Sequence, residues 1–375
     1  MAKIIDLADE AAVYGTRLLA EAGHDVIRID APGGDSVRRM PPFLGEIRDI
    51  EHSAYHYSFN AGKRSLSAAL DTAAGRDLLL DLARTADAAV ISESRWSDID
   101  VLVAANPRLV VAQVQDEDRS ELLSCARSGL LSLVGHPGGP PMVLGGHVAN
   151  CAVGLYVVVA TAAALYLQQE TGRGQVIRLS VEDCLEAMME QAAITYSTEG
   201  RVTQRRGYRG EITAASSAFA AADGFWLLSV NAAGRAWESF MEWVQDPVLM
   251  ADPALVDEAQ RYAKRDLIAE RLDAWSRQHP RAELVTEGQR RHIPVAPLST
   301  VLDILEDEQL LARGYFAEED HPEFGRIRAP RGAIATARGV HVGRAPTLGQ
   351  HNAEILAELG YSTADHEALI AAGAL

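Results

Sequence analysis

Residues 3–35 read KIIDLADEAAVYGTRLLAEAGHDVIRIDAPGGD and contain two kinds of hydrophobic pattern. Residues 4–7 and 26–29 are short apolar runs of the kind that form buried β-strands. The segment between them has the spacing of an amphipathic helix that closes at Gly23. This region therefore predicts a strand, a helix and a second strand, followed by a glycine-containing loop.

The same alternation continues further along the chain. GRDLLLDLARTAD (75–87) predicts a helix, and AAVIS (88–92) and RLVVAQV (108–114) predict two more strands. Strands that alternate with helices form a parallel sheet, whose ligand sites lie at the carboxyl ends of the strands. No GxGxxG motif follows the first strand, where residues 6–15 read DLADEAAVYG. We therefore do not expect NAD or FAD to bind in the usual way.

The sequence pattern changes after about residue 203. SAFAA and GFWLLSV, within residues 217–230, flank an Asp-Gly turn, which predicts a β-hairpin. Helical segments follow, and then the extended, proline-containing HIPVAPLST (292–300). We predict an α/β protein with a large domain of residues 1–200 and 326–375 and a small α/β domain of residues 205–325.

Composition excludes several classes of function. The chain has 375 residues and a net charge of −17, and so acidic a surface repels nucleic acids and anionic membranes. The apolar stretch Ala152 to Leu167 is short for a membrane span and rich in alanine, which favours a buried helix. Only three cysteines occur, without a CxxC motif, which argues against a zinc site or disulfide framework and favours a cytoplasmic protein.

Several blocks of sequence, spread over nearly the whole chain, carry a resemblance to a known family. They include LLAEAGHDVIRIDAPGGDSVRR (18–39), FNAGKRSL (59–66), SGLLSLVGHPGGPP (128–141), TGRGQV (171–176) and APTLGQHNAEIL (345–356). In this order the chain resembles the class III CoA-transferases, which include formyl-CoA transferase, the carnitine CoA-transferases and the α-methylacyl-CoA racemases. The resemblance implies a Rossmann-like large domain, a smaller α/β domain and two interlocked chains, and hence a homodimer.

The resemblance also implies a coenzyme A thioester as the small-molecule acyl substrate, with no covalently bound cofactor and no metal, and it leaves the acyl group and the acceptor open. Arg38 matches a CoA-contacting arginine, and its guanidinium suits phosphate or adenine. Lys63 and Arg64 match a K-R-S run that either backs the pantetheine channel or is structural. Ser92 stands where the family has an adenine-side asparagine. Asp71 replaces a phosphate-side lysine, and an acid there opposes phosphate binding.

The position of the catalytic nucleophile also departs from the family. In the transferases an aspartate before a long apolar helix attacks the thioester and forms an aspartyl anhydride, and Asn150 stands at that position here. A carboxamide cannot form this anhydride, although Asn and Asp both cap helices well. The racemases pair the same aspartate with a histidine, which Ser120 replaces. We place Ser120, like Ser92, among the CoA-binding residues.

Three other groups near Asn150 are able to carry chemistry. Glu121 aligns with an acidic position of the family's site helix and suits a general acid or base. His147 lies three residues before Asn150. Cys151 either packs as a small core residue or forms a nucleophile and base pair with His147. The candidate catalytic residues are therefore Asn150, Glu121 and His147, and the sequence leaves open whether Glu121 or Cys151 replaces the nucleophile.

Three functions fit these residues. The first is a divergent enzyme that acts on an acyl thioester, or a related acyl substrate, without an aspartyl anhydride and with Asn150 in an oxyanion hole. The second is a non-catalytic subunit that forms a heteromer with an active paralogue. The third is a repurposed enzyme that no longer uses CoA. Arg38 and the TGRGQV block favour retained ligand binding, whereas Asp71 and Ser92 favour its loss.

Overall fold

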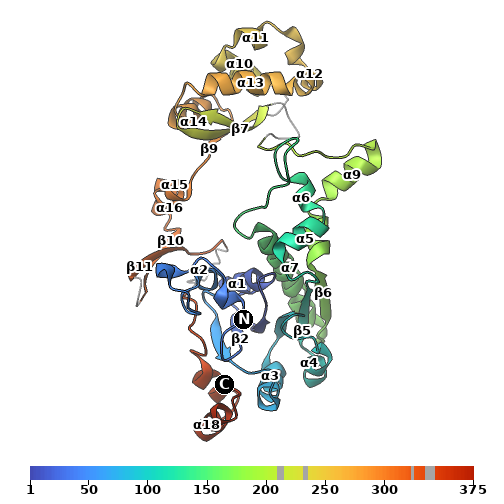
Figure 1. Cartoon of the computed structure of the whole chain (residues 1–375), viewed down its shortest axis with the longest axis vertical. Helices are drawn as coiled ribbons and strands as arrows, with labels where there is room; N and C mark the ends of the chain where they lie inside the picture. The colour runs from blue at the N-terminus through green and yellow to red at the C-terminus, as the bar shows by residue number, and fades with distance from the viewer. Residues whose placement is uncertain (209–214, 231–234, 322–324, 334–342) are drawn as a thin grey trace. The chain divides into compact units, whose positions relative to one another are not determined.

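The chain folds into two compact units. The computed structural model describes residues 1–208, 215–230, 235–321, 325–333 and 343–375 (Figure 1). The first unit contains Met1–Leu131, Val143–Val202 and Gly314–Leu375, and the second contains Ser132–Met142 and Thr203–Arg313. The second unit thus includes the short segment 132–142 in addition to its main part. The chain returns to the first unit at residue 314, twelve residues before the boundary that we predicted at 326.

A parallel sheet of six strands forms the centre of the first unit, in the order β3-β2-β1-β4-β5-β6. Its strands are β1 (Lys3–Leu7), β2 (Asp25–Asp30), β3 (Arg64–Ser67), β4 (Ala88–Ser92), β5 (Val110–Gln115) and β6 (Val176–Ser180). This is the strand order of a Rossmann fold, which confirms the predicted fold class. The sequence predicted β1, β2, β4 and β5 but not β3 or β6.

Helices cover both faces of this sheet. Neighbouring strand residues point to opposite faces, so Ile4 packs with α1 and α7, whereas Ile5 packs with α3, α4 and α17. Both faces are therefore buried, as parallel sheets require. The helices around the sheet are α1 (Val13–Glu21), α2 (Ala54–Phe59), α3 (Ala73–Thr85), α4 (Ile99–Ala105), α5 (Glu121–Arg127), α7 (Val148–Thr171), α8 (Val181–Ala187), α9 (Glu190–Glu199), α17 (Asn352–Glu358) and α18 (Thr363–Ala371); the short α6 (Leu130–Leu133) spans the boundary between the units.

Helix α7 is a core helix. Among the described helices it is the one long and apolar enough to cross a membrane by length and composition. One of its faces is buried against α1 and the sheet, and the opposite face is exposed, so the helix that we predicted to be buried is buried on one side. The two helices touch through their backbones, because a Cβ on Gly15 would lie 2.7 Å from the carbonyl oxygen of Gly154.

Replacing Gly154 with valine should lower the free energy of unfolding by about 1–3 kcal/mol, the usual cost of overpacking. A Cβ on Gly154 would lie 2.8 Å from the backbone nitrogen of Gly15, so α7 and α1 would have to separate. Gly145→Ala is the matched control, because a Cβ there meets nothing within 4 Å. Denaturant unfolding followed by circular dichroism measures both, and equal losses would contradict the close approach of the helices.

The C-terminal segment, red in Figure 1, returns to the unit that holds the N-terminus and covers the β3 edge of the sheet. The backbone N–H of Ser65 donates to His351 Nδ1 at 3.1 Å, and that of Ser67 donates to Asn352 Oδ1 at 2.9 Å. The N–H of His351 donates in turn to the Ser65 carbonyl at 3.1 Å. These bonds occupy groups that an edge strand otherwise exposes. The APTLGQHN block thus has a structural role.

The second unit is built on a three-stranded antiparallel sheet, β7 (Ala215–Ala221), β8 (Gly224–Val230) and β9 (Val295–Pro297). Strands β7 and β8 form the hairpin predicted from the Asp-Gly turn. Trp226, Leu228 and Val230 alternate along β8 and are buried in one core with the helices. The helices that share this core are α10 (Arg235–Val244), α11 (Pro247–Met250), α13 (Arg265–Ser276) and α14 (Arg281–Arg290), and α12 (Glu258–Ala263), α15 (Val301–Leu305) and α16 (Glu308–Ala312) belong to the same unit. A separate hairpin, β10 (Phe316–His321) and β11 (Gly325–Pro330), belongs to the first unit.

Candidate active site

The strand order reverses between β1 and β4, and ligands of such folds bind outside the carboxyl ends of the strands at this point. Asp9 follows β1, and Ser92 is the last residue of β4. Ser92 Oγ donates to Asp9 Oδ1 at 2.7 Å and accepts the Asp9 N–H at 2.9 Å, and Ser94 Oγ donates to Asp9 Oδ2 at 2.5 Å. Ser92, a predicted CoA-binding residue, is 1% exposed and ties the loops after β1 and β4 together.

The three predicted catalytic residues lie together at the same edge of the sheet. Glu121 is the first residue of α5, which follows β5, and His147 immediately precedes α7. His147 Nδ1 lies 2.9 Å from Glu121 Oε2, and the backbone N–H of Asn150 donates to Glu121 Oε1 at 3.3 Å. The fold thus joins a carboxylate, an imidazole and the start of a long helix, although 26 positions separate Glu121 from His147.

Glu121 supplies the cap that α7 otherwise lacks. His147, at the N-cap position, makes no side-chain hydrogen bond to the helix. A carboxylate is stabilised there by the free N–H groups and by the positive end of the helix dipole. His147 also has a positive φ of 56°, which costs a non-glycine residue about 1–2 kcal/mol. Strain of this kind concentrates at functional sites.

Asn150 lies in the first turn of α7, where its backbone N–H contacts Glu121. The residue is 6% exposed, and its carboxamide has no hydrogen-bond partner among the residues that the structure describes. The carboxamide therefore keeps its donor and acceptor groups for a ligand. Because the group is neutral, it suits a hydrogen-bond donor to an oxyanion and does not suit a nucleophile.

Tyr55 holds His147 from α2, and we did not predict it. Its ring meets the His147 ring edge-on, with 4.9 Å between centroids, and its hydroxyl donates to the carbonyl of Glu10 at 3.2 Å. The residue is 5% exposed. The aromatic YHYSFN segment was visible in the sequence, but nothing in it indicates a contact with a residue so far along the chain.

Cys151 does not have the environment of a nucleophile. Burial and then the negative charge of Glu121 raise the pKa of its thiol to about 11, so the thiol stays protonated at neutral pH. The imidazole that would have to activate it, His147, is paired with Glu121 instead. Of the two replacements that the sequence left open, the geometry favours Glu121 as the chemically active group.

Arg38 lies inside the fold. Its side chain is completely buried, and the guanidinium donates to Asp30 Oδ2 at 2.8 Å, Glu51 Oε2 at 3.0 Å and the Pro346 carbonyl at 3.2 Å. These bonds join β2 to the C-terminal segment and leave no exposed face for a nucleotide. The position favours a structural role over the predicted CoA contact.

Lys63 is also buried. Its ammonium donates to Asp6 Oδ2 at 2.8 Å, to Thr16 Oγ1 at 2.7 Å and to Asn60 Oδ1 at 2.8 Å. Burial alone would raise the pKa of Asp6, but Lys63 and Arg28 outweigh it, so the pKa of Asp6 lies below its ordinary value. Lys63 thus joins β1 to α1, which favours the structural alternative for this residue.

Arg64 and Ser120 have different surroundings. Arg64 pairs with Asp25 Oδ2 at 2.6 Å and with Glu358 Oε1 at 2.7 Å, so it ties β3 to β2 and α17. Ser120 is the N-cap residue of α5, is only partly buried, and makes no side-chain cap. It directly precedes Glu121, and its hydroxyl has no hydrogen-bond partner among the residues that the structure describes.

A network of buried ion pairs supports the same edge, and sequence reasoning missed it. The Arg28 guanidinium lies 3.3 Å from Asp6 Oδ1 and 3.0 Å from Asp30 Oδ1, and it also pairs with Asp35. Burial alone would raise the pKa of Asp35, but Arg28 and Arg95 hold it well below its usual range. The available signal was the sequence IRID in a strand whose neighbours are apolar.

A cavity of about 450 Å³ opens beyond the carboxyl ends of β2 and β3. Its charged lining residues are Asp30, Asp71 and Arg95. Arg95 is already engaged, because it pairs with Asp35 and donates to the Ile29 carbonyl at 2.8 Å. Asp30 is likewise paired, with Arg28 and Arg38, so a phosphate at this place would meet no uncompensated cation and the added negative charge of Asp71, which makes the cavity a poor phosphate site.

Comparison with known proteins identifies the family. Residues 2–352 match the sequence profile of CoA-transferase family III. The chain belongs to this family. This match confirms the resemblance that we drew from the sequence blocks. Proteins of the family act on CoA thioesters. In this member, the carboxyl edge of the sheet combines the Glu121–His147–Asn150 cluster with the cavity beyond β2 and β3.

Similar family III proteins align over the whole chain. The succinyl-CoA:mesaconate CoA-transferase of Haloarcula hispanica is 28% identical and covers 96% of this chain and of its own. The succinyl-CoA:(R)-benzylsuccinate CoA-transferase subunit BbsE of Thauera aromatica is 29% identical and covers 100% of this chain and 97% of its own. The crystal structure of a CaiB/BaiF family protein from Brucella suis superposes with a TM-score of 0.80 at 26% identity, over 96% of this chain and 98% of its own.

Proposed function

We propose that this family III protein is an enzyme that acts on an acyl-CoA thioester, or a related acyl substrate, without an aspartyl anhydride. One observation carries the proposal. The Glu121 carboxylate contacts both the His147 ring and the backbone N–H of Asn150, so the residue at the family's nucleophile position adjoins an acid–base pair. The chemistry therefore shifts from covalent attack to proton transfer.

Each residue of the cluster has a distinct role. Glu121 acts as the general base or acid, and His147 holds its carboxylate and exchanges a proton with it. The Asn150 carboxamide and the free N–H groups of the first turn of α7 stabilise the oxyanion that forms on the thioester carbonyl. This set supports attack by water or an amine, or enolisation of the acyl group.

CoA approaches this cluster along the carboxyl edge of the sheet, where both the cluster and the 450 Å³ cavity lie. The acidic lining of that cavity predicts weaker nucleotide binding than a basic lining would give.

The three cysteines are unpaired thiols, which supports a cytoplasmic protein.

The protein should be a dimer that does not dissociate at micromolar concentration. Leu155, Tyr156, Val159, Tyr166 and Leu167 are exposed on α7, and so large an apolar face is typical of an interface. The interlocked dimer that the resemblance implies would cover it. Analytical ultracentrifugation measures the mass, and a stable species at the 40.4 kDa of one chain would contradict the dimer.

A second function is favoured by one observation. The protein of Thauera aromatica is named as a subunit, so similar chains occur in assemblies of unlike subunits. With Asn150 at the nucleophile position, this chain then serves as a non-catalytic partner of an active paralogue. Activity that appears only after such a paralogue is added would favour this function over the first.

Incubation of the purified protein with succinyl-CoA, the donor that both similar transferases name, tests the proposal. Chromatography follows the loss of succinyl-CoA and the appearance of free CoA or of a new CoA thioester, with water, amines or carboxylates as acceptors. We expect turnover by the protein alone. Calorimetry with CoA tests whether the protein is instead a repurposed enzyme that no longer uses CoA, because such an enzyme would show neither turnover of succinyl-CoA nor binding of CoA.

A further inference from the structure

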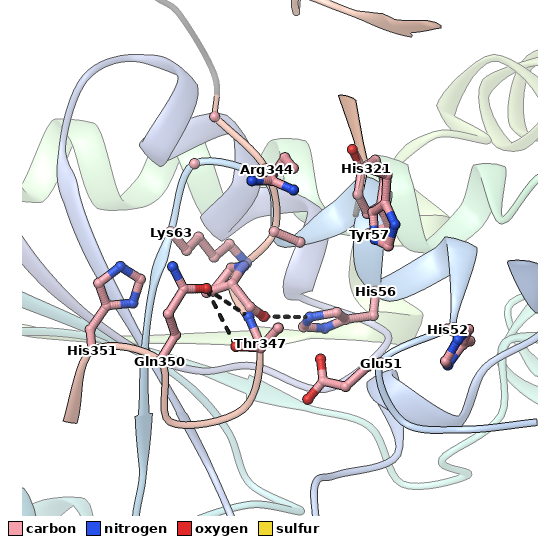
Figure 2. Close-up of a pocket in the computed structure, with 14 residues that line it drawn as sticks. Glu51, His52, His56, Tyr57, Lys63, His321, Arg344, Thr347, Gln350 and His351 are labelled. Atoms are coloured by element: carbon pink, nitrogen blue, oxygen red, sulfur yellow. Dashed lines mark hydrogen bonds between the residues drawn. The ribbon is translucent and has the colours of Figure 1, made fainter. Parts of the chain in front are cut away.

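A second cavity, of about 610 Å³, lies in the first unit and is lined by none of the three catalytic candidates. Its walls come from residues 51–63, from 343–351 and from His321 at the end of β10 (Figure 2). The volume is within the range of small-molecule sites. All of its lining residues belong to one compact unit and to the described part of the chain.

The lining of this cavity has more basic than acidic side chains in a strongly acidic protein. It contains Lys63, Arg344 and the four imidazoles of His52, His56, His321 and His351, against one carboxylate, Glu51. Because Lys63 is paired with Asp6, Arg344 supplies the positive charge that remains for a ligand. The Glu51 carboxylate is already compensated, because it accepts from Arg38 Nη1 at 3.0 Å and from the N–H of Leu348 at 2.9 Å. A chain of net charge −17 thus has a local site where an anion meets little repulsion.

Internal hydrogen bonds fix the His56 ring as a donor. Lys63 donates to Asn60 Oδ1, so the Asn60 amide nitrogen faces His56 Nδ1 at 2.9 Å. The proton of the ring is then on Nε2, which donates to the Pro346 carbonyl at 3.2 Å, as the dashed line in Figure 2 marks. Burial lowers the pKa of His56 to about 3, so the ring is neutral at pH 7 and has no lone pair left for a metal.

His351 and Gln350 present N–H groups that the protein does not use. His351 Nδ1 accepts from the Ser65 N–H, so the neutral ring carries its proton on Nε2. Gln350 Oε1 accepts from the Thr347 N–H at 3.0 Å, and this bond leaves the side-chain amide N–H groups of Gln350 available as donors. Within the described residues, neither nitrogen has a hydrogen-bond partner. Both groups therefore favour an acceptor-rich ligand.

Arg344 adds a full positive charge to the wall of the cavity that residues 343–351 form. It is exposed, and one of its N–H groups donates to the Asp320 carbonyl at 3.3 Å. The remaining guanidinium donors have no hydrogen-bond partner in the described part of the chain. Guanidinium groups bind carboxylates and phosphates through charge-assisted hydrogen bonds.

We propose that this cavity binds a small oxyanion, a carboxylate or a phosphate, through Arg344, Gln350 and His351. The guanidinium supplies the charge, and the amide and the imidazole supply neutral N–H donors. The site is separate from the acyl-CoA chemistry proposed above and does not depend on it. It gives the protein a second place at which a metabolite anion is recognised.

Isothermal titration with inorganic phosphate and with succinate, in low-salt buffer at pH 7, tests the site. We expect one saturable site for at least one probe, and the probe that binds identifies phosphate or carboxylate as the ligand. Gln350→Glu keeps the Oε1 acceptor for Thr347 but replaces a donor with a negative charge. It should weaken binding by about tenfold or more. Arg344→Gln, at an exposed side chain that the fold does not need, should do the same.

Gln309→Glu is the matched control, because it adds the same charge at an exposed position of α16. It should bind the probe as the wild-type protein does. Two outcomes overturn the proposal: no saturable binding of either anion by the wild-type protein, or unchanged binding in both Gln350→Glu and Arg344→Gln. Neither outcome depends on acyl-CoA turnover, so the failure of this site and the failure of the proposed enzyme are distinguishable.

Discussion

Glu121→Gln should lower the rate of acyl-CoA turnover by about 10²- to 10⁴-fold, the usual contribution of a general acid or base. Glutamine keeps an oxygen that accepts the Asn150 N–H, so the start of α7 remains capped. It removes the negative charge that faces His147 and the ability to take up a proton. The loss should therefore appear in kcat, with a smaller change in KM.

A steady-state assay with succinyl-CoA over pH 5–9 measures this change and also shows whether the pH dependence of the wild-type enzyme disappears in the variant. Glu117→Gln is the matched control, because Glu117 lies on the same connection between β5 and α5 but is exposed and pairs with Arg127. It should retain full activity. A Glu121→Gln enzyme within threefold of the wild type would exclude Glu121 as the acid or base.

Arg28→Met should lower the free energy of unfolding by about 3–5 kcal/mol, the cost of removing one partner from a buried ion pair. The variant leaves Asp6, Asp30 and Asp35 without their shared cation and removes a bond of 2.9 Å to the Ala8 carbonyl. Burial raises the pKa of Asp30 even with Arg28 present, so the variant should also take up protons on folding.

Denaturant unfolding at several pH values measures the Arg28→Met effect. Stability of the variant should rise as the pH falls, because protonation neutralises the buried carboxylates that have lost their partner. Arg84→Met is the control, since its pair with Asp81 is exposed and should contribute at most about 1 kcal/mol. A loss as small as that of Arg84→Met would show that Arg28 does not hold the network together.

Much of the fold could be predicted from local pattern. The runs at 4–7, 26–29, 88–92 and 108–114 are apolar because both faces of the sheet are covered, and each became a strand. Strand β3, RSLS, was missed because it is short and mostly polar. Its polar groups are satisfied by residues 351 and 352, nearly 300 positions away, and local sequence carries no trace of such a contact.

The candidate site, like the fold, combines residues that the sequence could identify with contacts that only the folded chain shows. The resemblance singled out Glu121 and Asn150, and His147 was added because it lies three residues before Asn150, but only the fold brings β5, α5 and α7 together so that these residues touch. Arg38 was predicted to contact CoA because it matches a CoA-contacting arginine of the family, yet it is buried by Asp30 and by the distant Pro346. Burial of a charged side chain depends on partners that are far along the chain, so residue type alone could not predict it.

Intact-protein mass spectrometry after incubation with succinyl-CoA tests the absence of a covalent intermediate most directly. The reaction is quenched at intervals with acid, which preserves an acyl group on the enzyme, and a parallel sample is treated with hydroxylamine, which converts an anhydride or thioester of a glutamate side chain into a hydroxamate of higher mass than the carboxyl. Because Asn150 cannot form an anhydride and the Cys151 thiol is protonated, we expect succinyl-CoA to be consumed while the protein keeps its unmodified mass. A mass increase that maps to Glu121 or Cys151 during turnover would contradict the account and identify that residue as the nucleophile.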